Sequence, residues 1–319
     1  MQTRRINADK PHLWKADIAA SVDQFNQWFM RFAPEAFRST RGKTTEHVKA
    51  ALLATNDLRG LNASTLRANP SALPTLRMCT APPLAVDRLI GLADASKNLV
   101  GRMEEGKLPS KMQAAELESH LTKLCRILTR LLDRDIFPWL DDGTAPTDHE
   151  RDRASTIVAD RLCSAVANPI VRNAQEQRQL ALIGDYLEKR GYRRQPHPAG
   201  KPLTEMERGT YTFRMNLPVG KTLKVNIPVD VVIQPKRLRK ERLPLLIEAK
   251  SAGDFTNTNK RRKEEATKIH QLQATYGPTV AFVLFLCGYF GSDYLGYEAA
   301  EGLDWVWEHR IDELVKLGL

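Results

Sequence analysis

The apolar run from Thr279 to Cys287 limits the fold of this chain more than any other feature of its sequence. After its first residue the run has no polar side chain, and its length is that of a β-strand, far too short to cross a bilayer. Such a run predicts a central strand that is buried on both faces of a sheet. We therefore expect layers of other elements on both sides of this strand.

The residues from 170 onward alternate between helical and β-like patterns. The segment 171–190 has the spacing of an amphipathic helix and ends at Gly191, a residue type that commonly stops helices. The further predicted elements are strands at 210–217, 223–233 and 243–250, a charged helix at 259–276, the strand at 279–287 and a closing helix over 305–317. This order predicts an α/β fold, in which a mixed β-sheet core is flanked by helices.

Residues 1 to about 140 show helical spacing instead, so we expect a mostly α-helical N-terminal part. Helix-start signals occur at Ser21, at Thr44 or Thr45, at Pro82–Pro83 and at Ser110. The segment Asp141–Thr147 has the composition of a linker, and Asn168–Pro169 is expected to end the helix that follows it. The predicted domains are therefore a helical region at 1–145 and an α/β domain at 146–319.

Charge and cysteine content narrow the class of protein. The net charge of +10 favours polyanionic partners, above all nucleic acid, although a merely basic soluble protein is the alternative. The four cysteines, Cys79, Cys125, Cys163 and Cys287, form no CxxC pair, as expected for reduced thiols of a cytoplasmic protein. We expect no membrane segment, no signal peptide and, since no GxxxxGK[ST] loop occurs, no nucleotide cofactor.

Three residues on two neighbouring predicted strands carry the strongest chemical signal. Asp230 lies on the strand 223–233, and Glu248 and Lys250 lie on the strand 243–250. Because strand side chains alternate between faces, Glu248 and Lys250 share a face, and pairing of the strands brings Asp230 beside Glu248. Two clustered carboxylates suit Mg²⁺, and a nearby lysine can orient water or offset charge in the transition state. The pattern predicts phosphodiester hydrolysis, with Asp230 and Glu248 as metal ligands.

The tripeptide pattern Glu-x-Lys has little weight alone, since Glu105–Gly106–Lys107 also matches it. That match lies in a polar stretch, with no β-pattern and no partner aspartate on an adjacent strand. For Glu248 and Lys250 the alternative is surface charge at a strand end. The apolar segment Pro244–Ile247 argues against it, because this segment runs directly into Glu248 and carries the charges to the edge of a core.

Glu176, on the helix before the strands, is a candidate third catalytic carboxylate. A helix packed on the sheet by Leu180, Ile183 and Leu187 can direct such a side chain toward the metal or its water. A solvated glutamate beside Arg172 and Arg178 is the alternative, and the sequence favours neither.

Two basic segments are candidates for contact with DNA. The first leads from the Glu-x-Lys strand into a helix, and its DNA-binding candidates are Asn257, Asn259, Lys260, Arg261, Arg262 and Lys263. Amides bond phosphates or base edges, cations follow the DNA backbone and the helix start attracts anions. A solvated charged face, paired with Glu264 and Glu265, is the alternative. The second segment is Lys236, Arg237, Arg239, Lys240 and Arg242, either beside the duplex or at a solvated hairpin tip.

The residues Asp230 and Glu248–Ala249–Lys250 resemble the PD-(D/E)XK nuclease motif, and Leu246–Glu265 as a whole resembles type II restriction endonucleases. Together with Leu76–Ala93, Leu13–Lys15 and Phe25–Phe29, these residues are similar to the XamI family over most of the chain. The resemblance implies a Mg²⁺-dependent endonuclease that cuts duplex DNA at a short palindrome. The prototype of the family reads GTCGAC, and sites can differ between members. A palindrome implies a homodimer, and the helical N-terminal region is then expected to recognise DNA, to form the dimer, or both.

One residue departs from the motif, because Asp230 follows Pro-Val rather than proline directly, and Asp254 is the alternative to it. Two other functions stay open at this point. One is a PD-(D/E)XK nuclease of DNA repair or of branched DNA, and the other is a non-catalytic DNA-binding protein with structural acidic residues. The large helical N-terminal part favours the restriction enzyme, since reading a site needs surface beyond the catalytic core.

Overall fold

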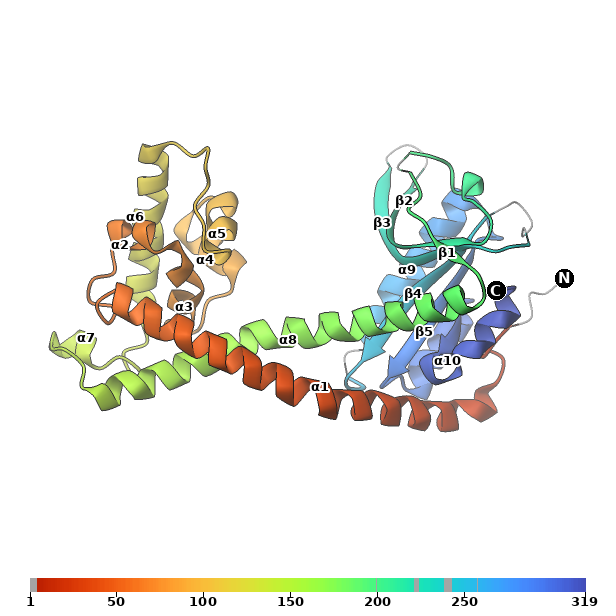
Figure 1. The fold of residues 1–319 in the computed structure, drawn as a ribbon, viewed down its shortest axis with the longest axis horizontal. Coiled ribbons are helices and arrows are strands. Elements are labelled where there is room, and N and C mark those ends of the chain that lie inside the picture. Colours follow the sequence, from red (N-terminus) through yellow and green to blue (C-terminus); the bar gives the residue numbers. More distant parts are fainter. Residues whose placement is uncertain (1–4, 199, 221–223, 238–242, 257) are drawn as a thin grey trace. The chain divides into compact units, whose positions relative to one another are not determined.

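The computed structural model describes residues 5–198, 200–220, 224–237, 243–256 and 258–319 (Figure 1). The chain folds into two compact units. The first unit, called here the sheet unit, combines residues 1–32 with 172–319, and the second, the helical unit, holds residues 33–171. Two long helices, α1 (Pro11–Ala54) and α8 (Asp148–Lys189), contribute residues to both units.

The sheet unit is built on one mixed sheet with the strand order β1-β2-β3-β4-β5-β6. The strands are β1 (Arg193–Arg194), β2 (Thr210–Val219), β3 (Val225–Gln234), β4 (Leu245–Ala252), β5 (Ala281–Gly288) and β6 (Asp304–Trp307). The pairs β2–β3 and β3–β4 are antiparallel, whereas β1–β2, β4–β5 and β5–β6 are parallel. β5 lies between β4 and β6, and Phe282–Gly288 are all buried, which confirms the central strand that the apolar run predicts.

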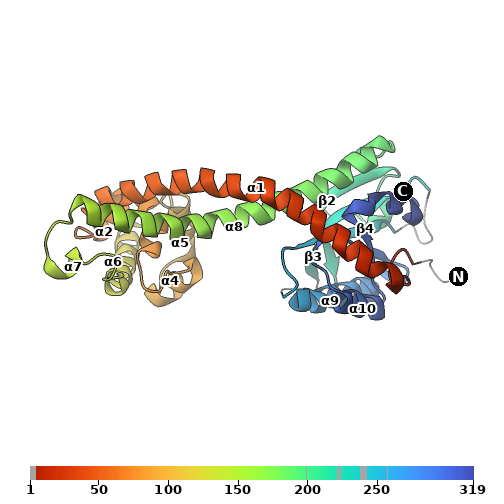
Figure 2. The ribbon, with the colours of Figure 1, turned by 90° about the horizontal axis from the view of Figure 1, so that it is seen from below.

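Helices cover both faces of this sheet. On one face, Leu246, Leu284 and Leu286 pack with residues of α9 (Thr258–Tyr276) and α10 (Ser292–Ala300), which lie side by side in Figure 2. On the other face, Ile247 and Phe285 pack with α8 and with the 3₁₀ helix η4 (Glu308–Leu317). The alternation along β4 and β5 thus divides the core into two layers, and the predicted α/β fold with its mixed sheet is confirmed.

The helical unit has a single core. Its shorter elements are α2 (Ala63–Ala68), η1 (Pro70–Ala72), α3 (Leu73–Met78), α4 (Val86–Ala93), α5 (Lys97–Glu104), α6 (Ala114–Leu131) and α7 (Trp139–Asp142). The apolar stripe of α6, with Leu121, Leu124 and Leu128 fully buried, packs against α2 and α4. The helical nature of this part agrees with its sequence. The compact units divide near residues 32 and 171, however, whereas the predicted boundary lies at 145, because α8 begins in one unit and continues into the other.

Several predicted element boundaries are wrong. α8 continues through Pro169, where a break was expected, and α1 continues through Pro34 as one helix instead of two. A proline removes one helical hydrogen bond, but buried residues on both sides of each proline hold the helix in place. The helix expected from Pro82 is divided at Asp94, which adopts a left-handed conformation with φ of 47°. Trp305–Trp307 forms a strand because it pairs with Leu284–Leu286 of β5.

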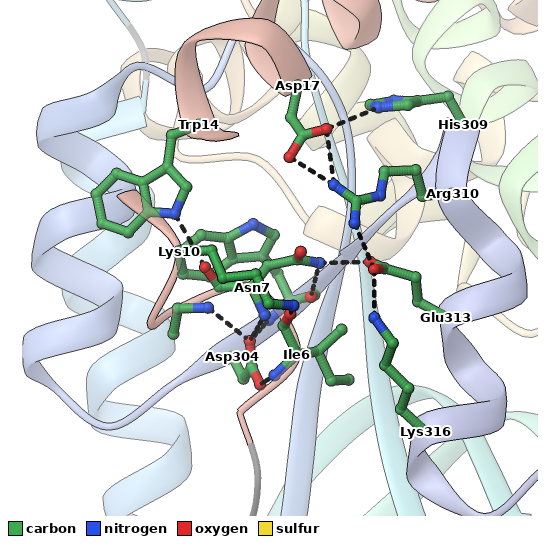
Figure 3. A network of polar contacts seen from close by, with 12 residues as sticks. Ile6, Asn7, Lys10, Trp14, Asp17, Asp304, His309, Arg310, Glu313 and Lys316 are labelled. Atoms are coloured by element: carbon green, nitrogen blue, oxygen red, sulfur yellow. Dashed lines mark hydrogen bonds and ion pairs between the residues drawn. The ribbon is translucent and has the colours of Figure 1, made fainter. Parts of the chain in front are cut away.

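The N-terminal segment is fastened to β6 by a network that we call the clasp (Figure 3). The Asp304 carboxylate accepts hydrogen bonds from the backbone N–H groups of Ile6, Asn7 (2.9 Å) and Ala8 (3.1 Å). The Asn7 amide donates to the Trp305 carbonyl at 2.9 Å and to the Glu313 carboxylate at 2.7 Å. Ile6, Asn7 and Ala8 therefore belong structurally to the sheet unit.

Two general properties complete the fold. Among the described helices, none combines the length and apolarity required to pass through a membrane. Cys79, Cys125, Cys163 and Cys287 are all buried and carry free thiols.

Candidate active site

Asp230 lies where the pairing of β3 with β4 ends and its pairing with β2 is interrupted at one residue. The β3–β4 pairing ends at Val231–Ile247, and the Asp230 carboxylate instead accepts a hydrogen bond from the Ala249 N–H at 2.8 Å. On the other side, the β2–β3 register omits the pair Arg214–Asp230, because Arg214 adopts a left-handed φ of 53°. Strain of this kind in a non-glycine residue commonly marks functional sites. Backbone pairing is therefore interrupted on both sides of β3 at Asp230.

Glu248 and Lys250 are two residues apart on β4, so both side chains lie on the face of the strand that α9 covers. A chain of alternating charges connects them with two residues of that helix. Lys268 Nζ lies 2.6 Å from Glu248 Oε2, Lys250 Nζ lies 3.1 Å from Glu248 Oε1, and Lys250 Nζ lies 3.5 Å from Glu265 Oε1. The Tyr294 hydroxyl of α10 then donates to Glu265 Oε2. Each carboxylate of the chain thus interacts through both of its oxygens.

This chain of charges leads from a cavity into the core. The cavity, of about 510 Å³, is lined by Asn226, Ile227, Pro228, Glu248, Lys250, Lys263, Glu264, Glu265, Thr267, Lys268 and Gln271. Lys263 and Glu264 are exposed at its rim, whereas Glu248 and Glu265 are buried. Glu298 and Tyr294 are fully buried beneath Glu265. The rim therefore carries one lysine and one carboxylate, whereas Glu248 and Glu265 lie deeper in the cavity.

The electrostatics of the site reflect burial and crowding of like charges. Burial, together with the charge of Glu248, raises the pKa of Asp230 to about 6. Burial alone would lower the pKa of Lys250, but the carboxylates of Glu248 and Glu265 outweigh this effect and the pKa is raised. Burial also raises the pKa of Glu265, and burial with the charge of Glu265 raises the pKa of Glu298 to about 9. Lys250 is therefore cationic at neutral pH, and the two acidic ligand candidates repel each other.

The donor set fits a hard divalent cation. No cluster of three or more His, Cys, Asp or Glu side chains with metal-binding geometry occurs among the described residues. Mg²⁺ does not need one, because it is commonly held by one or two carboxylates, waters and substrate phosphates. Asp230 and Glu248 supply only oxygen donors, and the mutual repulsion that raises the pKa of Asp230 is what a bound cation would relieve.

The other sequence candidates lie apart from this cluster or outside the description. Glu176 forms an ion pair of 2.7 Å with Arg214 of β2. Asp254 follows β4, and its carboxylate accepts a hydrogen bond from the Thr256 N–H at 2.9 Å. In the second Glu-x-Lys match, Glu105 pairs with Arg102 at 2.6 Å in the helical unit. The geometry therefore brings together Asp230, Glu248 and Lys250, and no described contact joins Glu176 to them.

The DNA-binding candidates are only partly described. Asn257 lies outside the described residues, and Asn259, Lys260, Arg261 and Arg262 lie within α9 while their side chains are outside the description. Lys263 is exposed and lines the cavity. In the second basic segment Lys236 and Arg237 are exposed, Lys236 Nζ donates to the Arg190 carbonyl at 2.5 Å, and Arg239, Lys240 and Arg242 lie outside the described residues.

Sequence reasoning missed four residues of the charged chain, namely Glu265, Lys268, Tyr294 and Glu298. One signal was available, since Glu265 stands on the same helical stripe as the buried Ile269 and Leu272. A glutamate at a core-facing position needs a partner, and Lys250 is the partner here.

Comparisons with known proteins place this geometry in a class. A family model described as XamI restriction endonuclease matches residues 56–307. The chain is 57% identical over 313 residues to the type II restriction enzyme SalI of Streptomyces albus G, which covers 98% of this chain and 99% of that protein. It is also 27% identical to the type II restriction enzyme XamI of Xanthomonas campestris pv. amaranthicola over 191 residues. The aligned part covers 60% of this chain and 62% of that protein. No solved structure matches the chain significantly.

Fold, charged cavity and relatives together define a type II restriction endonuclease, a site-specific deoxyribonuclease whose substrate is DNA. More narrowly, the chain belongs to the XamI restriction endonuclease family. Enzymes of this class generally use a divalent metal ion.

Proposed function

We propose that this enzyme hydrolyses both strands of duplex DNA at a short palindromic site, with Mg²⁺ held by Asp230 and Glu248. The observation that carries the proposal is the clustering of Asp230 with Glu248 and Lys250, two residues that line a cavity together with Lys263 and Lys268. The first site to test is GTCGAC, which the resemblance to the family implies. A homodimer supplies one active centre to each strand of a palindrome.

The residues of the site divide the work of phosphodiester hydrolysis. Asp230 and Glu248 would hold the metal ion, which would supply polarisation of the scissile phosphate. Lys250 remains protonated because Glu248 and Glu265 raise its pKa, so it donates hydrogen bonds and does not act as a base. Its ammonium group orients the attacking water and offsets the negative charge that develops on the phosphate. The buried carboxylate of Glu265 holds Lys250 in place, with an Nζ–Oε1 distance of 3.5 Å.

Digestion of a sequenced plasmid, with and without Mg²⁺ and without any nucleotide, tests the proposal. We expect discrete fragments only with Mg²⁺, and mapping of their ends gives the site and the stagger together. A smear, or nicking only at branched structures, would indicate a repair nuclease. DNA binding without any cutting in Mg²⁺ would indicate a non-catalytic DNA-binding protein.

Substitutions test the assignment of residues. Asp230→Ala and Lys250→Ala should each slow cleavage by roughly 100-fold or more, while binding of the site is largely kept. Lys107→Ala, which alters the lysine of the second Glu-x-Lys match, is the matched control and should cut at the wild-type rate. Single-turnover cleavage and gel-shift titration measure the two properties. Wild-type cleavage by Asp230→Ala, with loss of cleavage in Asp254→Ala, would move the metal ligand to Asp254.

A further inference from the structure

Lys268 of α9 lies beside the proposed metal ligand, at a place where the sequence motif has no lysine. Its Nζ lies 2.6 Å from Glu248 Oε2, closer than Lys250 Nζ lies to Glu248 Oε1. Its side chain is 13% exposed and lines the same cavity as Glu248 and Lys250. The stem runs beside the Phe282 ring, whose centroid is 5.9 Å from Nζ. The ammonium group therefore lies in the cavity, between the Phe282 ring and the Glu248 carboxylate.

Two lysines contact the two oxygens of Glu248, so a divalent cation bound to the same carboxylate would compete with them. A cation between Asp230 and Glu248 needs an oxygen of Glu248, and it repels an ammonium group at 2.6 Å. Of the two lysines, Lys250 retains a second carboxylate, since Glu265 Oε1 lies 3.5 Å from its Nζ. Among the described residues, Lys268 forms an ion pair with one carboxylate, that of Glu248. Lys268 is thus the lysine that metal binding displaces.

We propose that Lys268 is a further catalytic residue with two successive partners. Before the metal binds, it neutralises Glu248. After the metal binds, its ammonium group donates to a non-bridging oxygen of the scissile phosphate and stabilises the charge that develops there. This inference rests on the proposed function of Asp230 and Glu248.

The surroundings of Lys268 favour the phosphate over another protein group as its second partner. Glu265 is already engaged by Lys250 and by the Tyr294 hydroxyl. Glu264 lies one helical turn before Lys268 but is exposed at the rim, where solvent weakens an ion pair. A phosphate in the cavity would instead meet Lys268, Lys250 and Lys263 together.

Two opposite effects of one substitution test this inference. Lys268→Met keeps the apolar stem beside Phe282 and removes the charge. Calorimetric titration of the DNA-free protein with Mg²⁺ should show tighter binding in Lys268→Met than in the wild type. Single-turnover cleavage at saturating Mg²⁺ should be about 100-fold slower. Lys268→Arg keeps a cation and should recover part of the cleavage rate. Lys316→Met, which removes the lysine of a 2.6 Å ion pair with Glu313 outside the site, should change neither property.

The outcomes separate this inference from the proposed function. If the wild type cuts and Asp230→Ala does not, the proposed function stands and Lys268→Met alone decides the role of Lys268. Unchanged or weaker Mg²⁺ binding in Lys268→Met would contradict the proposed competition between Lys268 and Mg²⁺ for the Glu248 carboxylate. Cleavage at the wild-type rate would overturn the catalytic role and leave Lys268 as a structural counterion. Circular dichroism and thermal unfolding of all variants verify that the comparison is between folded proteins.

Discussion

At the scale of single residues, the proposed catalytic lysine, Lys250, contacts an acid that the active-site motif does not contain. Glu265 and Glu298 are 1% and 0% exposed, and they lie together with Tyr294 beneath Lys250. Two carboxylates buried side by side cannot both be charged at moderate cost, so one of them keeps its proton. The raised pKa of Glu298, about 9, indicates that Glu298 is the protonated one, while Glu265 is the carboxylate that contacts the Lys250 ammonium group at 3.5 Å.

This pair predicts a loss of stability at alkaline pH. The folded-state pKa of Glu298 is raised to about 9 from 4.5. Its contribution to the free energy of unfolding is therefore fully present below pH 4.5 and is lost as the pH rises toward 9. Glu298→Gln stays neutral at every pH, so its unfolding free energy should fall less between pH 7 and pH 9 than that of the wild type. Urea denaturation in the presence of a chelator, at both pH values, measures the difference. Equal losses in the two proteins would contradict the protonated state of Glu298.

The sequence allowed Asp230, Glu248 and Lys250 to be predicted because their spacing follows strand alternation, which is a local property. Lys268 and Tyr294 could not be predicted in the same way. Their roles depend on how α9 and α10 are rotated against the sheet, and packing of Ile269 and Leu272 on β4 and β5 determines that rotation. Lys268 lies in the middle of a charged helix and has no local feature that distinguishes it from the other lysines of α9.

At the scale of elements, the strands were easier to predict than the helix ends. Each predicted strand from residue 210 onward overlaps an observed one, since apolar runs bounded by turn residues are local signals. The continuous helices α1 and α8 were missed because tertiary packing outweighs the local cost of Pro34 and Pro169. β6 was missed because only its pairing with β5 makes a strand of Trp305–Trp307.

The clasp of Figure 3 is the element-scale feature with the clearest energetic consequence. Asp304→Ala leaves the N–H groups of Ile6, Asn7 and Ala8 without their acceptor, and all three residues are buried. We expect the unfolding free energy to fall by about 2–4 kcal/mol, since unsatisfied buried donors are costly. Asp312→Ala, which removes an 88% exposed carboxylate paired with Arg190, is the control and should change it by less than about 0.5 kcal/mol. Similar chemical denaturation midpoints for both variants would contradict the importance of the clasp.

At the scale of the whole molecule, the excess of positive charge agrees with the proposed binding of a palindromic DNA site. The chain has 48 lysines and arginines against 38 acidic residues, and a basic surface attracts DNA before any base is read. The helical unit has no part in the described catalytic cluster. We therefore keep the prediction that it contributes to site recognition, to dimerisation, or to both.

Mixed dimers test the proposed stoichiometry. Co-expressed wild-type and Asp230→Ala chains with different tags can be purified as a hybrid, in which one active centre is intact. Because each centre is expected to cut one strand, the hybrid should convert a supercoiled plasmid with one site into nicked circles. Agarose gels distinguish nicked from linear plasmid. Linear product formed at the wild-type rate by the purified hybrid, or failure to isolate any hybrid, would contradict the homodimer.

The clasp also has a consequence for how the enzyme is made in a cell that contains cleavable DNA. Asn7 and Asp304, which bond to each other, are 297 positions apart, so a ribosome completes nearly all of the chain before they can meet. The carboxylates and lysines of the proposed centre, Asp230 to Lys268, emerge earlier than β6, to which the N-terminal segment is fastened. An unfinished chain therefore carries the residues of the proposed centre without β6 and without the clasp. Translation order by itself delays formation of the clasp until synthesis has passed Asp304.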